Sequence, residues 1–344
     1  MRRHDSRVSR QEPSEARPHR RSLPRLSLMW ITSIGTYIPA EVRDNAFYAQ
    51  ATGWTAERVG KSAGISTRHV AGPDEDAFTM ALAATEDCLR RANDAGGKPD
   101  LIISGSYTPT DLIGTIAHRL QRALHLRAAR ALYISTGCSS MLNAMEIAEG
   151  YFATEKSRVC IATASEHNTL YCDPSDEVCG HLWGDGAGAF LLSSSRPAGG
   201  LSLRVLALTT RGHGDEGRGP DAVYLKPRGG GLRMPAGADV FRHAVECMCA
   251  AARAVLESTG LTIDAMRYFV PHQANQRITD RVAERLGCSP SRVVSNISCY
   301  GNTGSAGAVL ALASIAGQLR TGEHALIAVF GGGYSSGAVI LRAE

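Results

Sequence analysis

Apolar and polar positions follow one another along the chain in blocks that predict alternating helices and strands. An apolar residue recurs every three to four positions over 78–96, which predicts a helix, and the apolar run at 100–105 predicts a buried strand. The same helix–strand pair recurs at 240–259 and 267–271. Helices and strands that alternate in this way are typical of β-α units around a central sheet.

Further segments repeat in the same order, which predicts an internal duplication. The pairs lie about 165 residues apart: helices 114–125 and 276–286, strands 131–135 and 292–297, helices that begin at 136–140 and 302–306, and strands 158–164 and 324–330. From Gly184 to Gly331 the offset is only 147 (331 − 184), so we place an insertion at 166–183 in the first half. Two halves packed by pseudo-twofold symmetry predict an α/β fold with two sheets and five αβαβα layers.

Charge divides the chain into a basic leader and a nearly neutral remainder. Residues 1–28 hold eight Arg against three acidic residues, so their net charge is 8 − 3 = +5 and that of 29–344 is 4 − 5 = −1. The leader lacks the apolar stretch of a secretion signal, and we expect it to be disordered or to follow a mis-chosen start codon. After the leader we predict two halves, at 29–198 and 199–344. A near-neutral remainder argues against binding of nucleic acid. The sequence has no run of about 18 apolar residues, so no membrane-spanning helix is predicted.

The cysteines indicate a reducing compartment. There are nine of them at irregular spacing, and an odd number of this kind in a large chain predicts free thiols and a cytoplasmic location. Cys172, Cys179 and His181 lie close in sequence, but their spacing does not match a zinc template, so we expect no metal.

Cys138 is the first candidate for chemistry. It lies in STGCSS (135–140), between a predicted strand and a helix whose apolar stripe includes Met141, Met145 and Phe152. Unpaired N–H groups and the dipole at a helix N-terminus favour a thiolate. An ordinary buried cysteine is the alternative interpretation of this residue taken alone.

His272 and Asn302 make a functional interpretation stronger. His272 ends the apolar strand in VPHQANQR (270–277), and strand ends are where α/β folds place reactive groups. Asn302, in YGNTGSAG (300–307), follows the predicted strand 292–297 and occupies nearly the position of Cys138 in the other half. Taken singly, they could be a core histidine and a helix N-cap. Pseudo-symmetry would bring the helix starts at Cys138 and Asn302 together at the interface of the halves, and the joint placement of all three residues on strand ends favours a functional role.

Six motifs taken together resemble the bacterial β-ketoacyl-acyl carrier protein synthase III family, of the thiolase superfamily. They are STGCSS, CDPSD (172–176), GDGAGA (184–189), PHQANQRI (271–278), YGNTGSA (300–306) and FGGGYSSG (330–337). The resemblance runs from about Ile31 to Arg342 and implies a thiolase-like fold, a homodimer, no cofactor, and acyl-coenzyme A or acyl carrier protein as partners. Its Cys-His-Asn site maps onto Cys138, His272 and Asn302.

These residue types suit a decarboxylative condensation. A thiolate takes an acyl group from a thioester, which divides one transfer into two steps. The N–H groups of Cys138 and Gly332 are expected to form the oxyanion hole. A malonyl thioester then loses carbon dioxide, and neutral His272 and the Asn302 amide donate hydrogen bonds to the enolate.

The resemblance also suggests residues that contact the substrate. Trp54 matches an aromatic residue that stacks on the coenzyme A adenine, Ile113 matches a position at the far end of the acyl pocket across the dimer, and Arg277, followed by Arg281, matches a docking site for acyl carrier protein. A solvated helix face is the alternative for these arginines.

Other features depart from the family pattern and leave alternatives open. Glu177 stands where many members carry an Arg for the coenzyme A phosphates, and 211–235 is a glycine-rich stretch that could be a mobile loop. A specialised relative in polyketide or other secondary metabolism is therefore expected. The alternatives are an acyltransferase acting on a hydroxyl or amine of a natural product, which needs a general base, and an inactive structural partner subunit.

Overall fold

A computed structural model describes residues 29–93, 97–108 and 111–344. The leader predicted at 1–28 lies outside the described residues. The division of the remainder at 198 and 199 stays a prediction, although the strand order described below repeats between the two parts of the chain.

Two layers of strands form the centre of the molecule. The first has the order β5-β4-β6-β7-β1, with β1 at Trp30–Tyr37, β4 at Leu101–Gly105, β5 at Arg130–Ile134, β6 at Val159–Glu166 and β7 at Gly186–Ser193. The second has the order β11-β12-β13-β8, with β8 at Leu203–Gly212, β11 at Met266–Pro271, β12 at His324–Gly331 and β13 at Ser335–Ala343. Trp30 and Ile31 pair with Arg204 and Leu203, so a single short contact joins the layers into one hydrogen-bonded sheet.

The strand directions repeat between the two layers. In the first layer β4 is parallel to β5 and β6, whereas β7 is antiparallel to β6 and β1. In the second, β11 is parallel to β12, whereas β13 is antiparallel to β12 and β8. The predicted strand 292–297 is wrong: only an isolated bridge between Phe269 and Val293 takes the place of β5. A three-residue turn and a short helix at Ile297 leave no room there for an extended segment.

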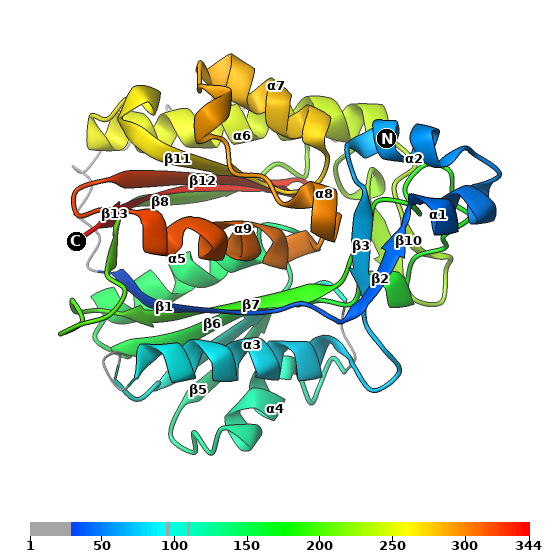
Figure 1. The fold of residues 1–344 in the computed structure, drawn as a ribbon. Coiled ribbons are helices and arrows are strands. Elements are labelled where there is room, and N and C mark those ends of the chain that lie inside the picture. Colours follow the sequence, from blue (N-terminus) through cyan, green and yellow to red (C-terminus); the bar gives the residue numbers. More distant parts are fainter. Residues whose placement is uncertain (1–28, 94–96, 109–110) are drawn as a thin grey trace, which may run out of the picture.

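Helices complete five layers, as the duplication predicted (Figure 1). Between the sheets lie α5 (Ser140–Ala153) and α9 (Gly307–Ile315), while α3 (Ala77–Ala92) with α4 (Ile116–Ala123) and α6 (Gly237–Thr259) with α7 (Gln276–Leu286) cover the outer faces. Nearly every residue of α9 is buried, because a helix between two sheets has no face left for solvent. The largest apolar cluster accordingly joins both sheets to the central helices, through residues such as Phe190, Leu142, Val309 and Val339.

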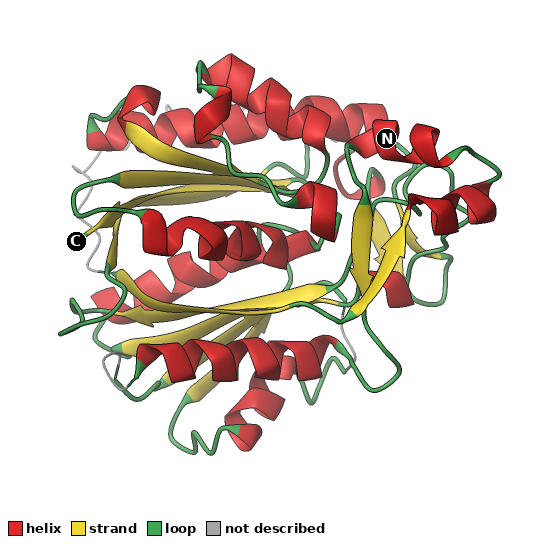
Figure 2. Ribbon diagram, in the orientation of Figure 1, coloured by secondary structure: helices red, strands yellow, loops and turns green. Residues whose placement is uncertain are grey.

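Smaller elements cap one end of the layers (Figure 2). They are β2 (Glu41–Asp44), α1 (Asn45–Thr52), α2 (Ala56–Ala63), β3 (Thr67–Val70), β9 (Tyr224–Lys226), β10 (Gly231–Arg233) and α8 (Ile297–Tyr300). The expectation of a loop throughout 211–235 needs correction, because β9 and β10 pair there as a hairpin. None of the described helices is both long and apolar enough to cross a bilayer.

Candidate active site

Cys138 lies in the tight connection between β5 and α5. Gly137 has a φ of 59°, and a Cβ added to it would lie 2.8 Å from the Gly332 nitrogen, so the turn requires glycine. The thiol is half-buried. Burial, and then the nearby Glu166 carboxylate, raise its pKa to about 12, although hydrogen bonds from Tyr107 and the backbone at Gly332 oppose the rise. In the free protein, desolvation therefore outweighs the thiolate-favouring helix N-terminus that the sequence predicts.

His272 follows β11 directly, as the sequence predicted. Its backbone N–H donates to the Ala328 oxygen at 2.8 Å, which fixes the end of the strand. Burial lowers the pKa of the imidazole to about 4, so the ring is neutral at physiological pH. Its Nδ1 has no hydrogen-bond partner among the described residues. A neutral ring can still donate one hydrogen bond to a substrate.

Asn302 follows the short helix α8 rather than a strand, and its backbone is held on both sides. Its N–H donates to the Leu182 oxygen at 2.8 Å, and its own oxygen accepts from the Gly184 N–H at 3.1 Å. The side-chain Oδ1 accepts from the Gly304 N–H at 3.0 Å. Because the amide oxygen is engaged in this way, the amide nitrogen is the end that remains as a donor.

Two cavities meet at Cys138. A small one of about 100 Å³ contains Cys138, His272 and Asn302 in its wall, so the structure brings the three predicted residues to one space. A second cavity of about 450 Å³ extends from Cys138 past Tyr107 and Trp183 to the hairpin β9–β10. The sulfur can thus reach a long substituent on one side and the histidine and asparagine on the other.

Each half supplies the loop that supports the other half's reactive residue. The turn before β13 lies on the cysteine: a Cβ added to Gly331 would lie 2.7 Å from the Cys138 nitrogen. The equivalent turn before β7 lies on the asparagine, with an isolated bridge between Trp183 and Asn302. Gly332 lines both cavities, in agreement with its expected position beside the sulfur.

Comparison with known proteins identifies the relatives of this arrangement. Residues 133–212 match the model of 3-oxoacyl-[acyl-carrier-protein] synthase III, and residues 256–343 match that of its C-terminal part. The chain is 34% identical over 326 residues to a β-ketoacyl-[acyl-carrier-protein] synthase III of Rhodospirillum rubrum, covering 91% of this chain and 100% of that protein. The chain belongs to the β-ketoacyl-[acyl-carrier-protein] synthase III family. It is therefore a condensing enzyme of the acyltransferase class.

Solved structures agree with membership of the synthase III family. A 3-oxoacyl-[acyl-carrier-protein] synthase III from Aquifex aeolicus superposes with a TM-score of 0.84 at 30% identity, covering 91% of this chain and 99% of that one. The priming β-ketosynthase of the R1128 polyketide pathway gives 0.82 at 29% identity, covering 94% and 99%. The thiolase-like fold expected from the sequence is thereby confirmed.

The residues predicted from the synthase III resemblance to contact the substrate differ in how well their surroundings suit that role. Trp54 is half-buried, but the Arg58 guanidinium lies 3.8 Å from the centre of its ring, so one stacking face is covered. Arg277 is exposed and donates to the Lys61 oxygen at 3.0 Å, which ties α7 to α2. Arg281 pairs with Glu284 on the surface. Ile113 is 90% exposed and does not line the described cavities of its own chain.

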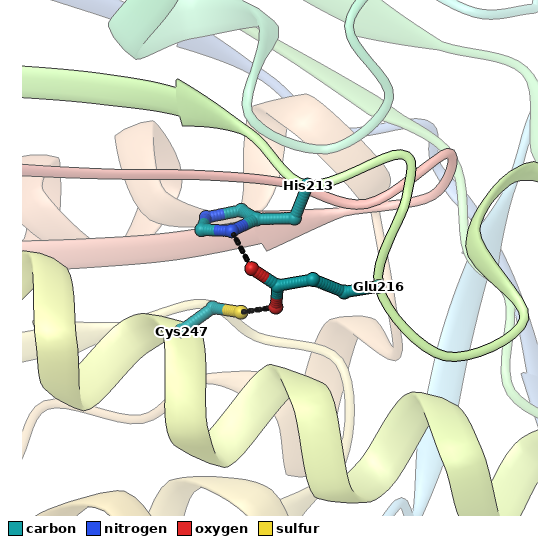
Figure 3. A group of neighbouring side chains, drawn as sticks. All are labelled: His213, Glu216 and Cys247. Atoms are coloured by element: carbon teal, nitrogen blue, oxygen red, sulfur yellow. Dashed lines mark hydrogen bonds and ion pairs between the residues drawn. The ribbon is translucent and has the colours of Figure 1, made fainter. Parts of the chain in front are cut away.

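A polar network anchors the loop that forms one wall of the larger cavity (Figure 3). Glu216 accepts from the His213 ring at 2.9 Å and from the Cys247 thiol, with sulfur and oxygen 3.8 Å apart. The other ring nitrogen of His213 lies 2.9 Å from Ser336 Oγ. The three side chains could reach a common cation, but both ring nitrogens already have partners. The network is therefore explained as a tether between α6 and the loop that leads to Tyr224.

Sequence reasoning missed several residues of this synthase III site. Trp183 and Tyr107 line the larger cavity, and Glu166 and Asn168 are buried behind them. Tyr107 follows the predicted strand 100–105, so its place at a strand end was a usable signal. The others lie in or beside 166–183, which the duplication marked only as an insertion.

Proposed function

We propose that this synthase III family member takes an acyl group onto Cys138 and condenses it with a malonyl thioester, with loss of carbon dioxide. The observation that carries the proposal is that Cys138, His272 and Asn302 line one cavity, while a larger cavity begins at the same sulfur. The larger cavity suits an acyl chain, and the smaller one suits the reacting end of the extender unit.

The first step is transfer of the acyl group to sulfur. The Cys138 sulfur attacks the carbonyl carbon of the incoming thioester and forms a tetrahedral oxyanion. In our proposal the backbone N–H groups of Cys138 and Gly332 donate to that oxygen. When the oxyanion collapses, the carbon–sulfur bond of the carrier breaks, and the thiol proton leaves with the carrier thiol. Burial raises the pKa of Cys138 to about 12, so the thiol is protonated in the free protein and gives up its proton during this step.

In the second step the malonyl carboxylate leaves as carbon dioxide, and its electron pair forms an enolate. The enolate oxygen accepts hydrogen bonds from neutral His272 and from the Asn302 amide. The enolate carbon then attacks the acyl carbonyl, the bond between that carbon and the Cys138 sulfur breaks, and the released thiolate takes a proton from water. The lowered pKa of His272 suits this role, because the ring need not act as a charged base.

The competing function is transfer of the acyl group to a hydroxyl or an amine. That reaction requires a general base to remove the acceptor's proton. The amide of Asn302 cannot act as a base, and the pKa of His272 is about 4, so condensation is favoured. Release of carbon dioxide from a malonyl carrier protein decides between the two. Formation of an ester or amide without release of carbon dioxide would show that the alternative function is correct. If no acyl adduct formed at all, the interpretation as an inactive structural subunit would be favoured.

The donor and the assembly are also proposals. Acyl-coenzyme A and acyl carrier protein are both candidate donors, but Arg58 covers Trp54 and Glu177 is exposed near the expected phosphate position, so a carrier protein is favoured. A homodimer is supported by β5, the end strand of its layer, and by the nearby exposed Leu112 and Ile113. Light scattering of the purified protein tests the dimer. We also propose a cytoplasmic location, which the free state of the described cysteines supports.

Mass spectrometry of the intact protein and its peptides is the primary test. Incubation with a panel of acyl-coenzyme A and acyl-carrier thioesters should add one acyl group to Cys138. The donor that reacts fastest identifies the carrier. The lengths of the acyl chains that are accepted indicate how long a chain the larger cavity can hold. Failure of every donor to modify Cys138 would refute the nucleophile and with it the proposed function.

A further inference from the structure

Tyr334 lies in the turn between β12 and β13 and has a backbone conformation that is unusual for its residue type. Its φ is 57°, in the left-handed region where glycine is common and a large aromatic residue is rare. A residue keeps such a conformation only when its surroundings require it, and residues of this kind gather at functional sites. Tyr334 is 1% exposed, so the contacts of its side chain and backbone supply the requirement.

The neighbours of Tyr334 in the turn lie against the nucleophile. Gly332 packs on the connection between β5 and α5, since a Cβ added to Gly137 would lie 2.8 Å from the Gly332 nitrogen. On the other side of Tyr334, Ser335 Oγ donates to the Thr136 oxygen at 2.8 Å. A shift of Tyr334 would therefore move the proposed oxyanion donor relative to the sulfur.

The side chain of Tyr334 is fixed at both its ring and its hydroxyl. The ring packs against His243 and Phe330, with ring centres 4.9 and 5.1 Å away. The hydroxyl donates to Oδ2 of Asp239, in the first turn of α6, at 2.7 Å. Hydrogen bonds, first of all the one from Tyr334, hold the pKa of the Asp239 carboxyl well below its ordinary value, so the acceptor is charged. A hydrogen bond to a charged acceptor is stronger than one between neutral groups.

The same carboxylate fixes the loop that forms a wall of the larger cavity. Asp239 Oδ2 also accepts from the Arg218 N–H at 2.8 Å. This loop contacts the turn as well, because the His213 N–H donates to the Tyr334 oxygen at 2.7 Å. The loop then leads to Val223, which lines the cavity. Asp239 thus joins the turn and the cavity wall to the start of α6.

We propose that Tyr334 is a positioning residue, whose hydrogen bond to Asp239 holds the turn so that the Gly332 N–H meets the oxyanion in the acylation step. The enolate donors His272 and Asn302 belong to other segments, so the tether acts on the first step and not on decarboxylation. The inference rests on the proposed function, since it assigns a role in the first step of that function.

The test is the Tyr334→Phe variant, which keeps the ring and removes only the hydroxyl. We expect the rate constant of Cys138 acylation at saturating thioester to fall about three- to tenfold, because the oxyanion donor is displaced and not removed. The KM of the acyl donor should stay within about twofold, since no contact with the donor is lost. Carbon dioxide release from a malonyl carrier protein, by enzyme that is already acylated, should be unchanged. Rapid-quench sampling with intact-mass detection measures acylation.

Three results would overturn the proposal. An unchanged acylation rate would mean that the hydroxyl does not position the turn. An equal fall in acylation and in carbon dioxide release would mean that the variant only weakens the fold. A rise in KM without a change in the rate constant would mean that the hydroxyl affects substrate binding instead.

Variants at Asp239 test the other end of the tether. Asp239→Ala removes the acceptor and should slow acylation at least as much as Tyr334→Phe, whereas Asp239→Asn keeps an oxygen for the phenol and should restore most of the rate. Because Tyr334→Phe and Asp239→Ala break the same hydrogen bond, the double variant should lose no more than Asp239→Ala alone. Losses that multiply would contradict the tether. Should Tyr334→Phe not fold, equal rates in Asp239→Ala and Asp239→Asn would overturn the proposal.

Tyr37→Phe is the matched control. The Tyr37 hydroxyl also donates to a carboxylate, that of Glu75, but neither residue is among the described residues that line the two cavities at Cys138. Loss of this hydrogen bond should leave both steps at the wild-type rate. An equally slow acylation in Tyr37→Phe would mean that the effect is not specific to the turn, and the positioning role would be rejected.

The proposed function and this inference fail separately. Acetyl transfer from p-nitrophenyl acetate to the Cys138 sulfur releases p-nitrophenol and passes through the same kind of oxyanion, but it needs no carrier. Wild-type protein that accepts no acyl group from any thioester would refute the proposed function, while p-nitrophenyl acetate would still compare Tyr334→Phe with the wild type. Normal acylation of the wild type with an equal rate in Tyr334→Phe would refute the positioning role alone.

Discussion

The two halves use the same scaffold position for different chemistry. In the first half, the loop after β5 passes directly into α5, which places Cys138 at the start of a 14-residue helix. In the second half, Asn302 follows a four-residue helix and precedes a short 3₁₀ turn at Gly304–Ala306, and α9 begins only at Gly307. The first loop therefore presents a sulfur at the start of a helix, whereas the second presents an amide oriented by Gly304. A duplicated fold can thus divide nucleophile and donor between equivalent positions.

The largest effect should come from removing the nucleophile that the first half supplies. Cys138→Ala has no nucleophile, so we expect acyl transfer to fall by at least about 10³-fold and the acyl adduct to disappear. Intact-mass measurement after incubation with an acyl thioester checks this. Cys299→Ser, an exposed cysteine away from the cavities, is the matched control and should retain the adduct. An adduct on the Cys138→Ala protein would mean that another residue carries the acyl group.

Removing the second half's contribution should affect only the later step. Asn302→Asp keeps the oxygen that accepts from the Gly304 N–H but loses the amide donor and places negative charge beside the enolate. We expect carbon dioxide release to fall by about 10²–10³-fold, because that is the usual effect of losing one oxyanion donor.

Acylation of Cys138 in the same variant should remain within a few fold of the wild type. Measuring both steps on one preparation separates the halves. If Asn302→Asp lost acylation and decarboxylation equally, the division of labour between the two loops would be refuted.

The junction between the halves contains a buried carboxylate that should make stability depend on pH. Glu166 of β6 accepts hydrogen bonds from Thr108 at 2.8 Å and from Ser305 of the other half. Burial raises its pKa to about 7, above the ordinary carboxyl value, so the folded protein binds this proton more tightly than the unfolded chain. The stability that this group contributes is therefore present at low pH and is lost as the pH rises through 7.

Glu166→Gln removes the charge, so the variant should not lose stability in this way as the pH rises through 7. Relative to the wild type, the variant should gain free energy of unfolding between pH 5.5 and pH 8, on the order of 1 kcal/mol per pH unit over the range where the carboxyl titrates. Urea denaturation at the two pH values measures the difference. His272, whose lowered pKa acts in the opposite sense between about 6.5 and 4, is present in both proteins and cancels. An equal difference between variant and wild type at both pH values would contradict the assignment.

The parts of the site that follow from the duplication could be predicted from the sequence, and the parts added to it could not. Cys138 and His272 were found because each ends or follows an apolar strand, and Asn302 because it matches Cys138 in the repeat. Tyr107 and Asn168 were missed, since their place at the site depends on contacts between segments far apart in the chain. Strand 292–297 was predicted wrongly because Val293 has only one bridge to Phe269, too little pairing to form a strand, and periodicity cannot detect that.

The smallest expected effect is on docking of the carrier protein, and it should leave the chemical steps unchanged. Helices α4 and α7 occupy equivalent positions in the two halves, but α7 carries Arg277 and Arg281 beside the histidine strand. Among the described residues Arg281 pairs only with Glu284, and surface pairs contribute little to stability. Arg281→Ala should therefore leave folding and kcat unchanged and raise KM for a malonyl carrier protein by about two- to fivefold, through loss of attraction to an acidic partner. Arg122→Ala on α4, an exposed arginine of the equivalent helix, should change neither constant. If both variants raised KM equally, the effect would reflect overall charge, and the second half would have no special role in receiving the carrier.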